Sequence, residues 1–134
     1  MIRSNLIYSV TFAFIIMCFF ACKQSTPQTK ELEALHKTVM SIHDDVMPKI
    51  NTIRKYSKNI RKNGNEKDFK SKIMVKRLEQ EEDAMMKWMQ QYKKPNFKNY
   101  DEAKAYLLDQ KIKIEKVRNG MLTVIDDSEK FLNK

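Results

Sequence analysis

Apolar residues recur along the chain at intervals of three and four, the spacing that predicts helices. From about residue 29 to 61 the apolar positions share one helix face: Leu32, Leu35, Val39, Ile42, Val46, Ile50 and Ile53. A second stretch ends at Lys93-Lys94-Pro95 and carries Met74, Leu78, Met85, Trp88, Met89 and Tyr92. A third follows Asn99 and carries Ala103, Leu107, Ile114, Val117, Met121, Ile125, Ser128 and Leu132. The pattern predicts an all-α fold of three long helices.

Short polar segments separate these helices and supply their expected ends. Lys62-Asn63-Gly64-Asn65 is the first break, because Asn-Gly favours a turn, and Asn65 is expected to cap the second helix ahead of Glu66 and Asp68. Asn99 with Glu102 forms a capping-box pattern before the third helix. Such short connections favour antiparallel neighbours, so we expect an elongated antiparallel three-helix bundle with coiled-coil-like packing. An extended two-helix hairpin with a swapped third helix is the alternative.

Pro48 lies inside the first helical stretch. Proline removes one backbone hydrogen bond and disfavours helical geometry at the residue before it, here Met47. We therefore expect a kink or short break near Pro48. Asp44 and Asp45 are candidate caps for the helix that restarts after it.

The first 21 residues differ in composition from the rest, since 16 of them are hydrophobic. Arg3 precedes an apolar run from Leu6 to Phe20, the arrangement of a secretory signal. The run is shorter than the about 20 apolar residues that span a membrane. It ends at Phe19-Phe20-Ala21-Cys22, which resembles the bacterial lipobox, whose cysteine receives diacylglyceryl before cleavage at its amino side.

The lipobox resemblance implies that Cys22 is a lipidation site. The expected organisation is then a lipoprotein signal peptide over 1–21, a lipidated tether over 22–29 and the bundle domain over 30–134. Two or three lipid chains hold a protein stably on a membrane, so we expect a lipid-anchored membrane protein. An ordinary cleaved signal and an uncleaved anchor are the alternatives.

Positive charge gathers where the first two helices are expected to meet. The chain has a net charge of +9, and residues 54–77 hold ten Lys or Arg against Glu66 and Asp68. We call these ten cations the basic tip: Arg54, Lys55, Lys58, Arg61, Lys62, Lys67, Lys70, Lys72, Lys76 and Arg77. Such a tip suits an anionic envelope polymer or an acidic protein partner. Nucleic acid is not expected, because an extracytoplasmic lipoprotein rarely meets it. The alternative is that the lysines only keep a long helical surface soluble.

Aromatic residues and lysines gather at the opposite end, around the turn between the second and third helices. They are Tyr92, Lys93, Lys94, Phe97, Lys98, Tyr100, Lys104 and Tyr106. Because aromatic rings and lysines suit a lipid headgroup layer, we expect a membrane-facing base here.

Motifs that carry enzyme chemistry are missing: the chain has two histidines, no HExxH, no P-loop and no CxxC. We expect Glu81-Glu82-Asp83 to be a solvated acidic turn, with Glu81 or Glu82 pairing a cation of a neighbouring helix. His36, Met40, His43 and Met47 share one strip of the first helix, and thioethers with imidazoles suit Cu(I) or, less simply, haem. The alternative is core packing, since methionine is a flexible filler. We expect no catalytic residue, cofactor or metal, with this strip as the outside possibility.

Three segments resemble a family of small helical lipoproteins of Bacteroidota: 40–49, 83–89 and 106–121. Members of that family are often labelled "viral A-type inclusion protein" through weak coiled-coil similarity. The resemblance covers about residues 30 to 132; it implies a helical bundle, a lipoprotein and an outer-membrane location, and it implies no established activity.

The expected function is a non-enzymatic, lipid-anchored structural or interaction module of the cell envelope. A periplasmic protein that binds Cu(I) or haem through the His/Met strip is the second hypothesis. A chaperone-like binder of unfolded chains is the third. The sequence leaves the oligomeric state open.

Overall fold

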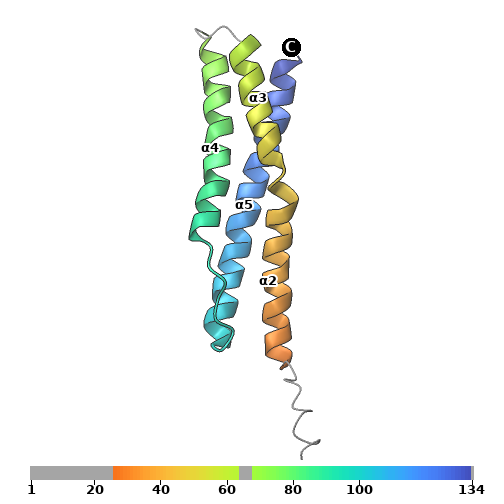
Figure 1. Cartoon of the computed structure of the whole chain (residues 1–134), viewed down its shortest axis with the longest axis vertical. Helices are drawn as coiled ribbons and strands as arrows, with labels where there is room; N and C mark the ends of the chain where they lie inside the picture. Colours follow the sequence, from red (N-terminus) through yellow and green to blue (C-terminus); the bar gives the residue numbers. More distant parts are fainter. Residues whose placement is uncertain (1–25, 64–67, 134) are drawn as a thin grey trace, which may run out of the picture.

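The computed structural model describes residues 26–63 and 68–133, of which 88% are helical and none lies in a strand. The helices are α2 (Pro27–Val46), α3 (Lys49–Asn63), α4 (Phe69–Gln91) and α5 (Tyr100–Leu132) (Figure 1). The all-α prediction is confirmed. The expected signal peptide, Cys22, the Gly64-Asn65 turn and Lys67 lie outside the described residues.

The kink expected near Pro48 is confirmed. Met47 and Pro48 separate α2 from α3, and the expected first helix is bent by 30°. The amide of Met47 still bonds the carbonyl of His43 at 2.8 Å, so the interruption is confined to one turn. Asp44 does not cap α3; its carboxylate accepts a hydrogen bond from His43 Nδ1 at 2.8 Å. Asp45 instead lies 3.6 Å from Arg118 of α5.

The caps of α4 and α5 arise from local sequence. Asp68 itself is the N-cap of α4 rather than an acid in its first turn, because its carboxylate accepts from the amides of Lys70 and Ser71. These bonds satisfy amides that have no partner within the helix, and they lower the pKa of Asp68, with the Ser71 hydroxyl as the largest cause. Asn99 caps α5 as expected, its side-chain oxygen accepting from the amide of Glu102.

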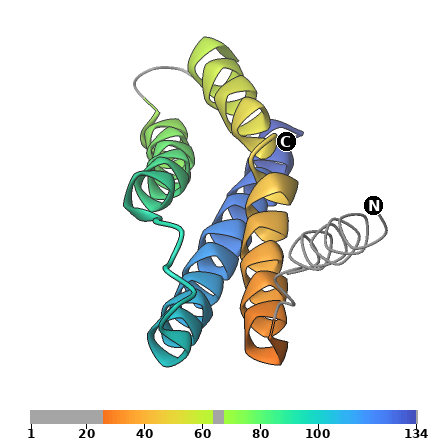
Figure 2. The same cartoon turned by 60° about the horizontal axis from the view of Figure 1, so that its bottom comes forward.

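The helices pack around α5, which contacts α2, α3 and α4, while α3 also contacts α4. Figures 1 and 2 show α2 and α3 following one another along α5, with α4 beside α3 and one half of α5. Because α4 ends at Gln91, residues 92–99 run as a non-helical segment, with a turn at 97–98, toward the start of α5. One half of the molecule therefore has three helices, and the other has two helices and this segment.

Two apolar clusters follow from that division. The larger cluster lies among α2, α3, α4 and α5 and includes Val46, Ile53, Leu78, Met85 and Met121. The smaller one joins Leu32 to Ala103 and Leu107, with Phe97, Tyr100 and Tyr106 packed against it. The expected apolar stripes supply most of both clusters. They omitted Ile60, Ser71, Val75, Gln110 and Val124, which are also buried.

None of the helices in the described residues is long and apolar enough to cross a membrane.

Candidate functional site

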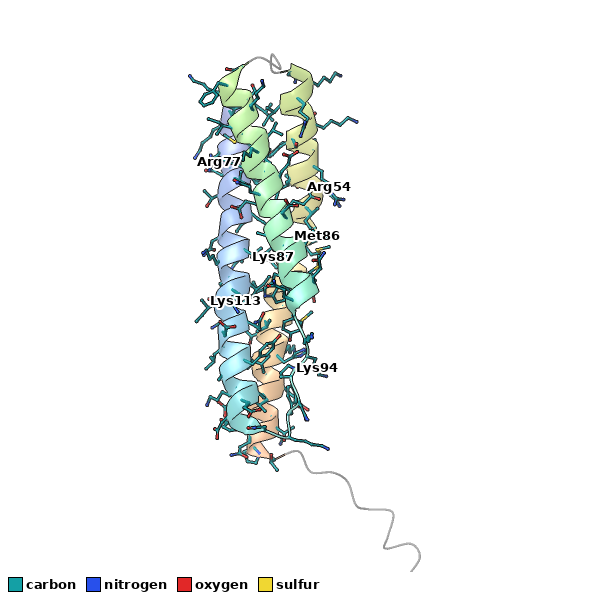
Figure 3. The ribbon with its side chains drawn as sticks, turned by 90° about the vertical axis from the view of Figure 1, so that its left-hand side faces the viewer. Arg54, Arg77, Met86, Lys87, Lys94 and Lys113 are labelled. Carbon is teal, nitrogen blue, oxygen red and sulfur yellow. The ribbon has the colours of Figure 1, made fainter. Side chains whose placement is uncertain are left out.

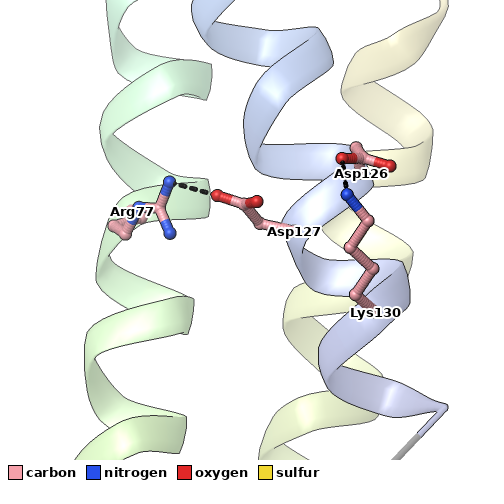
Figure 4. Close-up of polar contacts among 4 residues, drawn as sticks. All are labelled: Arg77, Asp126, Asp127 and Lys130. Carbon is pink, nitrogen blue, oxygen red and sulfur yellow. Dashed lines mark hydrogen bonds and ion pairs between the residues drawn. The ribbon is translucent and has the colours of Figure 1, made fainter.

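The three arginines of the basic tip are paired with carboxylates of neighbouring helices. Arg54 bonds Glu82 at 2.7 Å through Nε, and Arg61 bonds Glu79. Arg77 of α4 bonds Asp127 of α5 at 2.6 Å (Figure 4). The expected pairing of Glu82 with a neighbouring helix is confirmed. These arginines therefore link α3 to α4 and α4 to α5, and their charge is partly neutralised.

The positive charges of the tip that form no ion pair in the described residues are those of its lysines. Six of them are exposed and form no ion pair within the described part of the chain: Lys55, Lys58, Lys62, Lys70, Lys72 and Lys76. They come from the end of α3 and the start of α4, which lie together at one end of the molecule (Figure 1). The structure thus brings together the lysines that the sequence predicted as one site.

Two exposed apolar side chains lie among these lysines. Phe69 is 74% exposed and Ile73 is 44% exposed. Sequence reasoning missed them because both fall outside the apolar stripe of α4. Their spacing of four residues, out of phase with the buried Val75 and Leu78, is the signal that could have found them.

A second basic surface lies between α4 and α5, as a groove of about 770 Å³. Arg77, Lys87, Lys113 and Lys116 line it, around Trp88, Val117 and Val124. Figure 3 shows Arg77 and Lys87 on α4 and Lys113 on α5 along this side of the molecule. The sequence did not predict this groove, because it depends on how α4 and α5 are rotated against each other.

Glu81 lies in the groove directly against Gly120 of α5. A Cβ at residue 120 would lie 2.7 Å from Glu81 Cδ, closer than real contacts allow. Burial raises the pKa of Glu81, and the nearby charges of Arg77 and Lys116 partly oppose this shift. Glu81 is thus a half-buried carboxylate in a basic groove, and Glu82 beside it is the one that pairs.

The His/Met strip is engaged in packing. The His43 ring stacks on Trp88 with centroids 5.6 Å apart, and the His36 ring lies 6.2 Å from Tyr92. Burial is the main cause that lowers the pKa of His36, and the charge of Lys94 adds to it. Met47 packs against the larger apolar cluster, and Met40 is half-buried.

The two imidazoles are seven residues apart on one helix, which separates their backbones by about 10 Å along its axis. In the described ranges no three His, Cys, Asp or Glu side chains are grouped as a metal site. The structure therefore does not bring His36 and His43 together, and a Cu(I) or haem site stays a prediction.

The aromatic rings of the expected membrane-facing base turn into the molecule. Tyr106 accepts a hydrogen bond from the amide of Lys93 at 2.8 Å, and Tyr100 donates one to Glu31 of α2 at 2.5 Å. Lys104 also binds Glu31, at 2.6 Å. Bonds from Lys104 and then Tyr100 lower the pKa of Glu31, and its carboxylate raises the pKa of Lys104. The bonds of Tyr100 and Lys104 to Glu31 join α2 to α5, and the four aromatic residues of this end are partly buried.

Comparison of the chain with protein-family models, with curated proteins and with solved structures finds no match. The resemblance to the Bacteroidota lipoproteins is therefore a proposal that rests on the sequence segments alone.

Proposed function

We propose that this protein is a non-enzymatic, lipid-anchored module of the cell envelope that presents its basic tip to an anionic or acidic partner. We infer that its helices form an elongated antiparallel three-helix bundle, with the membrane anchor at Cys22 and the outer membrane as its location. The observation that carries the proposal is the group of six exposed lysines at one end of the molecule.

The position of the tip supports this function. α2 and α3 run from Pro27 to Asn63, so at 1.5 Å per residue the far end of the tip lies about 55 Å along these helices from the point where the chain enters α2. A lipid on Cys22 would be four residues before Thr26, the first residue described. The anchor and the tip would then occupy opposite ends of the molecule, which leaves the lysines free to meet a partner away from the anchor.

The electrostatics of the tip also favour an interaction. Arginines that pair within the protein hold the helices together, whereas unpaired ammonium groups keep a potential that attracts anions. Salt screens such a potential over about 8 Å at physiological ionic strength. Partner binding is therefore expected to weaken as salt is added.

The test uses the full-length protein in its own cells, with a photo-crosslinking residue at Asn59 on α3, between Lys58 and Lys62. In the tip variant, Lys55, Lys58, Lys62 and Lys76 are all replaced by glutamine. The matched control replaces four exposed lysines near the other end: Lys30, Lys37, Lys93 and Lys98. Both lose the same charge, so the proposal requires that only the tip variant loses a salt-sensitive envelope crosslink. Equal crosslinking in both variants, whether kept or lost, would overturn a binding role specific to the tip lysines.

The anchor is tested separately. Cys22→Ala is expected to abolish incorporation of radiolabelled fatty acid, since no other residue in the lipobox-like segment takes diacylglyceryl. Cys18→Ala is the control and should keep the label, because Cys18 lies within the expected signal peptide. Labelling that survives Cys22→Ala would overturn the assignment of Cys22 as the lipidation site and leave the tip proposal standing.

A further inference from the structure

The first two turns of α4 carry an apolar pair on their outer face. Phe69 and Ile73 are 74% and 44% exposed and are spaced by four residues, so their side chains are neighbours on the helix surface. At 100° per residue they project away from Ser71, Val75 and Leu78, which face the interior. The pair therefore contributes little to the core.

Lysines flank this pair on both sides. Around the helix, Lys72 and Lys76 lie to one side of Phe69 and Ile73, and Lys70 lies to the other. All three lysines are exposed and form no ion pair in the described parts of the chain. The surface thus combines positive charge at its edges with apolar side chains at its centre.

We propose that this surface binds an anionic lipid bilayer, with the lysines on the headgroup phosphates and with Phe69 and Ile73 in the acyl boundary beneath them. The inference rests on the proposed function, because it names the partner of the same basic tip. Lysines near an anionic membrane each add to binding, and phenylalanine is among the residues that interfacial helices bury at the boundary of headgroups and acyl chains. A bilayer supplies both chemistries within one surface.

Two other anionic partners fit the surface less well. A soluble polyanion would bind the lysines but would gain nothing from Phe69 and Ile73. An acidic protein needs about 800 Å² from each side for a stable interface. The tip is one end of an elongated molecule (Figure 1) and offers two exposed apolar residues, Phe69 and Ile73. A bilayer accepts a small insertion, because its binding adds the buried apolar area to the attraction of the charges.

The test uses the full-length protein, purified in detergent and reconstituted through its own N-terminal region into phosphatidylcholine vesicles. A second, fluorescent population of vesicles contains phosphatidylglycerol, and its recruitment is measured by co-flotation at low salt. Fluorescent vesicles of phosphatidylcholine alone show whether charge is needed. The soluble probe is polyglutamate, whose binding reports the lysines without any lipid.

Wild-type protein is expected to recruit the anionic vesicles and not the neutral ones. K70Q/K72Q/K76Q should weaken recruitment about a hundredfold, and F69S/I73S should weaken it about tenfold. The matched control is L108S/I112S, a pair on α5 with the same spacing of four residues and with exposures of 45% and 67%. It should recruit as the wild type does. Circular dichroism checks that each variant keeps its helices.

The outcomes separate the two proposals. If F69S/I73S recruits vesicles as well as the wild type, or if neutral vesicles are recruited equally, the lipid inference is overturned. If wild-type protein binds polyglutamate but recruits no anionic vesicles, the lipid inference also fails, and the basic tip remains a site for acidic partners. If K70Q/K72Q/K76Q equals the wild type with both probes, the lipid inference fails, and the tip proposal is then decided by the crosslinking test on Lys55, Lys58, Lys62 and Lys76.

Discussion

The carboxylate of Glu81 on α4 occupies the space that a side chain at Gly120 on α5 would fill. Glycine in the middle of a helix is less favourable than alanine by about 1 kcal/mol. Gly120 lies well inside the 33-residue helix α5, and a larger residue there would have to displace the end of the Glu81 side chain. The relationship also explains why the pKa of Glu81 is raised, because packing against α5 removes water from the carboxylate.

Gly120→Ala is expected to stabilise the protein by up to about 1 kcal/mol. The alanine methyl would meet the end of a flexible side chain, so Glu81 can swing into solvent, where its charge is better hydrated. Urea unfolding measures the change. In an E81A background the same substitution meets no carboxylate and should give the full gain. A loss of stability in the wild-type background alone would mean that the Glu81–Gly120 contact itself stabilises the fold.

Glu81 is expected to make stability fall as pH rises above its ordinary pKa of 4.5. Its pKa is raised in the folded state, so over that window the folded protein binds more protons than the unfolded chain. E81Q removes this contribution. The difference in unfolding free energy between wild type and E81Q should therefore change with pH between 4.5 and the raised pKa. A constant difference across that range would show that the carboxylate is well solvated.

His36 is expected to make stability fall as pH drops below about 6.5. Burial lowers its pKa in the folded protein, so the unfolded chain binds a proton that the folded protein resists. The loss begins near the ordinary pKa of histidine and is complete below the lowered one. H36Q should show a flatter dependence of the melting temperature on pH in this window. An unchanged slope in H36Q would rule out His36 as the cause.

Met121→Ala is expected to destabilise the protein by about 2–5 kcal/mol, because it leaves a cavity in the larger apolar cluster. Met121 is fully buried, whereas its neighbour Leu122 is 38% exposed. Leu122→Ala is the control and should change the unfolding free energy by about 0.5 kcal/mol or less. Urea denaturation of both variants compares neighbouring positions that are about 100° apart around α5, one buried and the other partly exposed. Equal losses would contradict the assignment of the buried face of α5.

Local features could be predicted from the sequence because their causes are local. The 3.6-residue period of apolar residues predicted the helices. Pro48 predicted the bend, and Asn99 predicted the start of α5. The cap of α4 was placed three residues early, at Asn65 instead of Asp68. Asn and Asp are both good caps, so the sequence alone did not choose between them.

The candidate site could be predicted only in part. Clustered lysines follow from sequence order, since the end of α3 and the start of α4 must lie near each other. The partners of Arg61 and Arg77 are 18 and 50 residues away, and sequence order does not identify them. Likewise, Phe97, Tyr100 and Tyr106 pack inward because α4 ends early and leaves a side of the smaller cluster to be covered.

The sequence by itself therefore determined the helical class, the bend and the end of the molecule at which lysines gather. Only the tertiary structure decided which charges are neutralised, which apolar side chains stay exposed and where Glu81 meets Gly120. The physical reason is that helix periodicity depends on neighbours three and four residues away. Ion pairs and grooves between helices depend instead on the relative rotation and axial offset of two packed helices.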